Sequence, residues 1–360
     1  MRAGAEPDPG AGKARPGWLI TGAIALAAAT VYLCFSIAQA LQSDVEPPGE
    51  PLAVSNRPAD ATASSANDVQ APVEQKQDEP KRAPKPTDSE VEEPRGELIA
   101  GLGPGVLDPA LLAVIEDAVG DDGEHIAVAA KRVSDGRFAA LNGDFEYYAA
   151  STFKLAVLYE AERRHFTGEL DYLDTIVISE EDAAEDLGTF GALDFEEDGS
   201  ITIGNLLEAM ITVSDNSSAV ALMHEFGSWN IDATLRSLGI ESMSVNSTEL
   251  WTTAADLARL MEAIYVGEGV SEVERAHMRE ILLNQRIRNG IPAAVGANGD
   301  GNLLVGNKTG TWEGAQHDVA FIEAQSGAYV LAVLTDGSWQ GWLTLQRVAT
   351  RIHTAMIEIP

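Results

Sequence analysis

The stretch from Tyr147 to Tyr159 constrains the fold most, because it is typical of a helix that is apolar on nearly every side. Such a helix has to lie inside a domain, with other elements packed around it. Its first turn nevertheless carries Ser151 and Lys154, which are three positions apart and therefore share a face. A buried lysine loses its proton easily and can activate a neighbouring serine as a nucleophile. The alternative is a helix-capping serine and a lysine that reaches solvent.

The composition excludes several classes of function. The 360 residues carry a net charge of −32, so the chain offers no basic field for phosphates and we expect no nucleic-acid partner. Cys34 is the one cysteine, which excludes an intrachain disulfide and a cysteine-based metal site. The histidines are scattered singly, so we expect neither a metal nor another cofactor. They are His125, His165, His224, His277, His317 and His353.

The N-terminal part of the chain is typical of a membrane anchor followed by a tether. Residues 18–41 carry no charge and could span a bilayer, and the basic residues within 1–17 favour a cytoplasmic N-terminus. The alternative is a signal peptide cleaved near Ala40, which would make the protein secreted. Residues 42–97 are rich in proline and acidic residues without apolar periodicity, which predicts a disordered tether. We therefore expect a single-pass protein of the cell membrane with its domain outside the cytoplasm.

Residues 98–360 have the pattern of one folded domain. Helical periodicity occurs at 109–119, through most of the middle, and at 341–357. Strand patterns occur at 125–133, 137–141, 303–305, 318–323 and 328–335. Strands at both ends around a helical insert predict the α+β class, with one antiparallel sheet flanked by helices and a helical subdomain.

Two further polar segments interrupt these patterns. Ser-Asp-Asn at 214–216 lies between two helical stretches, where it is typical of a helix cap. Lys-Thr-Gly at 308–310 lies within a strand pattern, where it could be a bulge or a turn. Lysine usage favours a larger role, because residues 98–360 contain only Lys131, Lys154 and Lys308. A domain that avoids lysine but keeps one in an apolar helix and one in a strand is expected to need both.

Ser-x-x-Lys at 151–154, Ser-Asp-Asn and Lys-Thr-Gly occur in the order found in class A β-lactamases and penicillin-binding proteins, which this chain resembles. The spacing also fits, with 60 positions from Lys154 to Ser214 and 94 from Ser214 to Lys308. The resemblance runs from about Leu107 to the C-terminus and includes residues 286–292 and 317–320. It implies the same fold and a serine hydrolase of β-lactam amide bonds.

The resemblance also implies a role for each motif residue. Ser151 would attack the substrate carbonyl and become acylated, with Lys154 taking its proton directly or through a water. Ser214 would protonate the leaving nitrogen, and Lys308 would keep the cleft positive and orient Ser214. The backbone N–H groups of Ser151 and Thr311 would form the oxyanion hole. The substrate would be held by Asn216, Thr309, Gly310 and Thr311.

One segment departs from the class A pattern. In class A β-lactamases, an Ω-loop between the second and third motifs carries a glutamate that drives hydrolysis of the acyl-enzyme. The corresponding residues 239–256 form a short stretch here, and its glutamates, Glu241 and Glu249, lie outside the expected run. Glu249 is the better placed of the two. The alternative function is therefore a D,D-peptidase or another penicillin-binding cell-wall acyl-enzyme with slow deacylation.

The sequence lacks the motifs that other functions would require. The Gly-x-Ser-x-Gly elbow of many serine esterases is absent. A receptor or scaffold that keeps the fold without catalysis would not need all three motifs. We expect a monomer whose substrate is a small-molecule β-lactam or a peptidoglycan stem peptide.

Overall fold

The computed structural model of the chain describes residues 102–123, 125–247, 250–296, 303–313, 315–336 and 341–358. The predicted cytoplasmic segment (1–17), anchor (18–41) and tether (42–97) lie outside these ranges. No helix within the described ranges is both long enough and apolar enough to cross a membrane.

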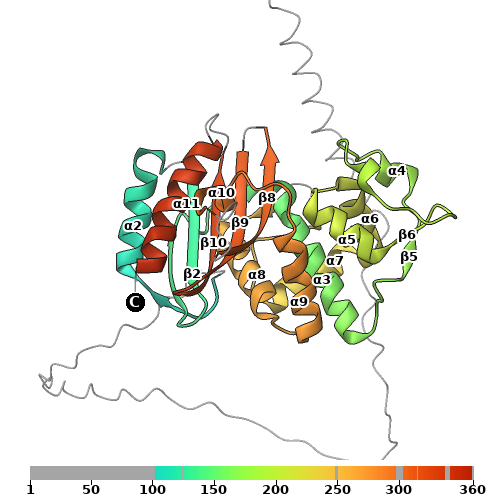
Figure 1. Ribbon diagram of the computed structural model, residues 1–360, viewed down its shortest axis with the longest axis horizontal. Helices are drawn as coiled ribbons and strands as arrows, with labels where there is room; N and C mark the ends of the chain where they lie inside the picture. Colours follow the sequence, from blue (N-terminus) through green and yellow to red (C-terminus); the bar gives the residue numbers. More distant parts are fainter. Residues whose placement is uncertain are drawn as a thin grey trace, which may run out of the picture. The chain divides into compact units, whose positions relative to one another are not determined.

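The largest sheet among the described residues has six strands, in the order β1-β3-β2-β10-β9-β8 (Figure 1). These strands are β1 (Val106–Leu107), β2 (Ile126–Arg132), β3 (Arg137–Leu141), β8 (Leu304–Trp312), β9 (Ala315–Ala324) and β10 (Gly327–Thr335). Neighbouring strands are antiparallel except β1, which pairs with β3 in parallel. The pairing of β2 with β10 joins the two ends of the domain, as the sequence pattern predicts. The predicted α+β fold is confirmed.

Strand β8 is longer than its apolar pattern predicts. The sequence gives 303–305 as the apolar part of this strand pattern and leaves a bulge or turn at 308–310, whereas β8 continues in register with β9 from Leu304 to Trp312. The interpretation of Lys-Thr-Gly as a bulge or turn is therefore wrong. Asn307 and Lys308 interrupt the apolar pattern, yet both side chains are fully buried because they are hydrogen-bonded.

Helices cover both faces of the sheet. On one face, α2 (Pro109–Val119) and α11 (Gly341–Glu358) lie side by side, and α8 (Ala254–Val266) packs on the other (Figure 1). Helix α2 begins where Asp108 accepts hydrogen bonds from the backbone N–H groups of Ala110 and Leu111. Its buried residues recur at helical spacing, so a single apolar stripe faces the sheet.

The middle of the chain is mainly helical, as predicted. Its central element is α3 (Lys154–Thr167), preceded by the 3₁₀ turn η2 (Ala150–Phe153). The first nine residues of α3 are all buried, which confirms an interior helix for the second half of the predicted stretch 147–159. Its first half is different: Tyr147–Tyr148 is a short strand and Ala150–Phe153 a 3₁₀ turn, so the helix begins later than predicted. Its buried carboxylates are hydrogen-bonded: Glu160 accepts from Arg163, Arg164 and Thr234, and Glu162 accepts from Tyr172.

The remaining elements complete the two ends and the helical part. They are η1 (Gly120–Asp122), β4 (Tyr147–Tyr148), β5 (Thr175–Ile176), α4 (Glu180–Ala183), η3 (Phe190–Ala192), β6 (Ile201–Thr202), α5 (Ile203–Thr212), α6 (Asn216–Phe226), α7 (Ser228–Ser237), β7 (Trp251–Thr252), α9 (Glu272–Leu283) and α10 (Ile291–Ala294). Short strands β4 and β7 pair beside the start of α3, and β5 pairs with β6 at the edge of the helical part.

Candidate active site

Ser151 lies in the tight turn η2, between β4 and α3. Ala150 before it has φ 44°, a left-handed conformation that costs an alanine on the order of 1 kcal/mol. Thr152 stabilises the turn, because its Oγ1 and its backbone N–H both donate to the carbonyl of Ala149, at 2.6 and 3.1 Å. Within the described residues no side chain caps η2 or α3, so the alternative of a helix-capping serine is wrong. The strained turn leaves Ser151 partly exposed.

Lys154 is fully buried, so the alternative of a lysine that reaches solvent is also wrong. Its Nζ donates to the carbonyl oxygen of Ser214 at 2.7 Å and to Oδ1 of Asn216 at 2.7 Å. The hydroxyl oxygen of Ser214 lies 3.3 Å away. None of these three partners is a carboxylate, so no hydrogen bond among them neutralises the charge of the amine.

Ser214 and Asn216 lie in the connection between α5 and α6. Ser214 has φ 62°, and Asp215 after it caps α6 by accepting hydrogen bonds from the N–H and hydroxyl of Ser218, at 2.7 and 2.6 Å. The other oxygen of Asp215 accepts from Thr189 Oγ1 at 2.6 Å. The predicted helix cap is therefore present, but Asp215 alone provides it. Ser214 and Asn216 remain free to contact Lys154.

Lys308 approaches the same hydroxyl from β8, the edge strand of the sheet. Its Nζ donates to Ser214 Oγ at 2.9 Å and to the carbonyl of Thr309 at 2.8 Å, and the side chain is fully buried. Both predicted lysines thus converge on one serine. Thr309 is buried and Thr311 is exposed.

Gly310 lets β8 approach the serine turn. A Cβ at this position would lie 2.9 Å from the carbonyl oxygen of Ala149 and 3.2 Å from Cβ of Ala150. Any side chain here would push the strand and the turn apart. The close approach brings Thr311, the next residue of β8, toward Ser151.

The electrostatics of the two lysines favour a neutral amine. Burial lowers the pKa of Lys154 well below its usual range, the charge of Lys308 lowers it further, and Asp215 partly opposes both. Burial also lowers the pKa of Lys308 to about 7, with Asp318 partly opposing. Two ammonium groups next to one half-buried hydroxyl repel each other, so the two lysines titrate as a coupled pair. A neutral Lys154 can act as a base.

Two supporting carboxylates were not assigned a role from the sequence. Asp215 belongs to the second motif, and Asp318 belongs to the segment 317–320 of the resemblance. Asp318 is fully buried in β9 and accepts from the backbone N–H of Ile291 at 2.7 Å and from Asn307 Nδ2 at 2.9 Å. Burial raises the pKa of Asp318 to about 7. It joins α10 to the strand that carries Lys308.

The proposed deacylation base, Glu249, lies outside the described residues. Glu241 is described and exposed, in the loop after α7. Among the described residues, no hydrogen bond of Lys154 goes to a carboxylate.

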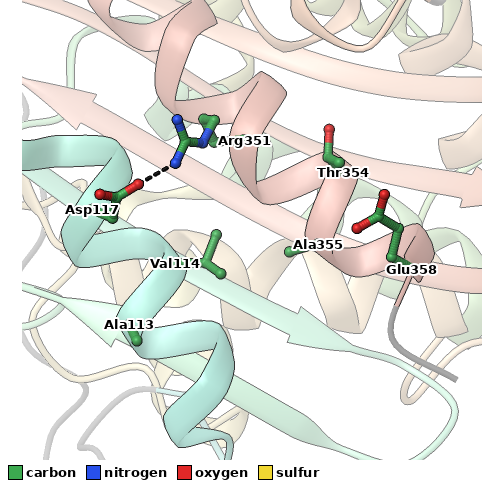
Figure 2. A pocket seen from close by; sticks show the side chains of 7 residues that line it. All are labelled: Ala113, Val114, Asp117, Arg351, Thr354, Ala355 and Glu358. Atoms are coloured by element: carbon green, nitrogen blue, oxygen red, sulfur yellow. Dashed lines mark hydrogen bonds and ion pairs between the residues drawn. The ribbon is translucent and has the colours of Figure 1, made fainter.

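Other parts of the described chain offer little for chemistry. No three histidine, cysteine, aspartate or glutamate side chains in these ranges are grouped to hold a metal ion. An open groove of about 350 Å³ lies between α2 and α11, where Asp117 and Arg351 form an ion pair (Figure 2). Its lining includes no residue of the three motifs. The residues are Ala113, Val114, Asp117, Arg351, Thr354, Ala355 and Glu358.

A sequence model described as the β-lactamase enzyme family matches residues 110–356, which include all three motifs. No curated protein sequence matches the chain. Solved structures with a similar fold include PBP-A, with 20% identity and a TM-score of 0.64, covering 72% of this chain and 100% of PBP-A.

Two β-lactamase structures are also similar. The enzyme from Sphaerobacter thermophilus has 23% identity and a TM-score of 0.61, covering 69% of this chain and 98% of that one. A reconstructed ancestral class A enzyme has 23% identity and a TM-score of 0.61, covering 68% of this chain and 99% of that one. At these identities the likeness shows the fold.

Proposed function

Because the chain belongs to the β-lactamase enzyme family, we propose that it is a serine hydrolase that forms an acyl-enzyme on Ser151 and opens β-lactam amide bonds. One observation carries this proposal. Two buried lysines from distant parts of the chain both contact the hydroxyl of Ser214, and one of them, Lys154, follows Ser151 by one helical turn. A purely structural site would not keep two lysine amines around one hydroxyl, because burying a group that is charged in water is costly.

Acylation uses the groups in a definite order. The Ser151 oxygen attacks the β-lactam carbonyl carbon while its proton passes to Lys154, directly or through a water. The negative oxygen of the tetrahedral intermediate is held by the backbone N–H groups of Ser151 and Thr311. The C–N bond then breaks, and the leaving nitrogen takes the proton of Ser214, which Lys154 or Lys308 replaces. Hydrolysis of the resulting ester by water returns the free serine.

Substrate binding follows from the same groups. The ammonium of Lys308, with Thr309 and Thr311, would attract the carboxylate of a penicillin. Asn216 would hold the side-chain amide of the substrate, and the backbone of Gly310 would lie against it. The solved structure of a PBP-A mutant, an acyl-enzyme complex with penicillin G, shares 21% identity with this chain at a TM-score of 0.64. That likeness supports a penicillin as the first probe.

The second candidate is a D,D-peptidase or another cell-wall acyl-enzyme. It is favoured by the short stretch 239–256 and by the expected position of the domain outside the cytoplasm, near peptidoglycan. It shares the acylation step and differs in what removes the acyl group. Rapid nitrocefin turnover would favour the β-lactamase, and a long-lived penicillin adduct with release of D-alanine from stem peptides would favour the peptidase.

The test of acylation is labelling of the full chain by a fluorescent penicillin, followed by intact mass. We expect one penicillin per chain, no label in Ser151→Ala, and labelling slowed at least about 100-fold in Lys154→Ala because the proton acceptor is lost. Ser217→Ala is a matched control: its hydroxyl is buried in α6 and has no hydrogen-bond partner among the described residues. It should label normally. Wild-type labelling in Ser151→Ala would overturn the assignment.

A further inference from the structure

His317 lies in β9, paired in register with Gly310 of β8, and is fully buried. Its Nδ1 lies 3.2 Å from the backbone nitrogen of Thr335, whose N–H can only donate. Nδ1 is therefore the acceptor, and the imidazole proton must be on Nε2. Nε2 lies 3.0 Å from the carbonyl oxygen of Tyr148, so it donates to that oxygen. The surrounding contacts thus select one neutral tautomer.

The neutral form is also the stable one. Burial lowers the pKa of His317 to about 4, so the ring is uncharged at neutral pH. The edge of the ring meets Tyr147, with centroids 5.9 Å apart. A protonated ring would place a second N–H against the N–H of Thr335.

The bond to Tyr148 holds the peptide that leads into the nucleophile turn. The carbonyl of Tyr148 accepts from His317, and the N–H of Ala149, on the same peptide group, donates to the carbonyl of Leu250 at 2.7 Å. The chain then passes through Ala150, with φ 44°, to Ser151. Because the peptide is held on both edges, its orientation determines where the N–H of Ser151 lies.

His317 itself lies in β9, which pairs with β8, and β8 carries Thr311, the second oxyanion donor of the proposed mechanism. His317 stands opposite Gly310, and Thr311 follows Gly310 in β8. We propose that His317 is a positioning residue that sets the separation of the Ser151 and Thr311 N–H groups by joining the sheet to the serine turn. The inference rests on the proposed acyl-enzyme function. Donors that stabilise an oxyanion work only within a narrow range of distance, so a small shift lowers the acylation rate.

Two variants of the full chain separate the two hydrogen bonds. A glutamine amide reaches about as far as Nε2 and can still donate to Tyr148, whereas an asparagine oxygen lies near Nδ1 and can accept only from Thr335. Both lose the ring and one hydrogen bond. We expect His317→Gln to acylate within about threefold of the wild type, and His317→Asn to be slower by at least about tenfold at saturating penicillin. The dissociation constant of the noncovalent complex should change little in either.

Further variants distinguish a change in the acylation rate from a loss of folded protein. His317→Phe keeps a ring of similar size and removes both hydrogen bonds, so its acylation should be as slow as that of His317→Asn. Thr335→Val is the matched control, since it removes hydrogen bonds to the backbone of Gln316 at 3.0 and 2.9 Å without affecting Tyr148. It should lower the melting temperature and leave acylation of the folded protein unchanged. Rates are normalised to the fraction that finally labels.

The two proposals fail in different ways. A wild-type chain that takes no label contradicts the proposed function, and this inference with it. If the wild type is labelled but His317→Gln and His317→Asn acylate at equal rates, only the positioning role is overturned. Acylation at the wild-type rate in His317→Phe would overturn it as well.

Discussion

At the scale of single residues, the three lysines of the domain illustrate two uses of a buried charge. Lys131 donates to Glu262 at 2.7 Å and to the carbonyl of Leu102 at 3.1 Å, so its charge is paired. Lys154 and Lys308 instead donate to hydroxyl, amide and carbonyl oxygens. Among the described residues neither amine has a carboxylate hydrogen bond, so burial dominates and both pKa values fall. That difference separates Lys131 from the two lysines of the candidate site.

The pKa of Lys308 predicts how substrate binding depends on pH. Burial lowers this pKa to about 7, so the ammonium loses its proton as the pH rises through 7. If that charge attracts the penicillin carboxylate, the affinity of the noncovalent complex should fall by up to about tenfold per pH unit above 7. The concentration dependence of acylation between pH 6 and 9 measures this affinity. A penicillin methyl ester, which has no carboxylate, should show no such loss, and an equal loss for both compounds would contradict the role.

At the scale of elements, the site depends on the edge strand β8 lying against the turn η2. Two glycines of β8 allow close packing at different places. Gly310 faces Ala149 and Ala150, next to Ser151, while a Cβ at Gly306 would lie 2.3 Å from the ring of Phe321 in the core. The same strand thus has one glycine at the site and one in the interior.

This difference predicts separate effects for two alanine substitutions. Gly310→Ala should push β8 away from the serine turn and slow acylation about 10- to 100-fold, which corresponds to roughly 1.4–2.8 kcal/mol of barrier. Gly306→Ala should instead overpack the core and cost about 1–3 kcal/mol of unfolding free energy, with acylation of the folded fraction unchanged. Chemical denaturation and penicillin labelling measure the two quantities. Normal acylation in Gly310→Ala would show that the close approach is not needed.

At the scale of the whole molecule, the site forms where the sheet meets the helical part. The third motif comes from β8, the first from the start of α3, and the second from the α5–α6 connection. All groups for acylation lie within the described residues. A carboxylate base for hydrolysis would come from residues 239–256, whose candidate Glu249 lies outside them. The overall rate of turnover is therefore expected to depend on this one segment.

We expect a slow β-lactamase in which the acyl-enzyme accumulates during an initial burst. Deacylation requires a base within hydrogen-bonding reach of the attacking water, and a short segment limits that reach. Glu249→Gln keeps the shape of the side chain and removes the base, so it should slow deacylation and leave acylation unchanged. Glu241→Gln, an exposed glutamate in the same segment, is the control and should have no effect. Stopped-flow turnover of nitrocefin separates the two phases, and fast turnover without a burst would contradict the prediction.

Much of this protein could be predicted from local sequence patterns. The apolar stretch 147–159 predicted the interior helix, and the strand patterns at both ends predicted the sheet. Motif order identified the serine, the two lysines and the second serine. Such features are encoded within a few neighbouring residues, because periodicity and motif chemistry are local properties. Strands that contain buried polar residues are harder to predict. Asn307 and Lys308 interrupt the apolar pattern of β8, because their side chains are stabilised there by hydrogen bonds and not by apolar contacts.

Local patterns were thus enough to predict the fold class and the candidate nucleophile, whereas the assembly of the site depends on contacts between distant parts of the chain. Contacts of Ser214 with Lys154 and Lys308 join residues 60 and 94 positions apart, and no local pattern fixes their distances. The tautomer of His317 depends on Thr335 and Tyr148, which lie on different elements. The lowered pKa values likewise come from burial, which is a property of the folded packing around each amine.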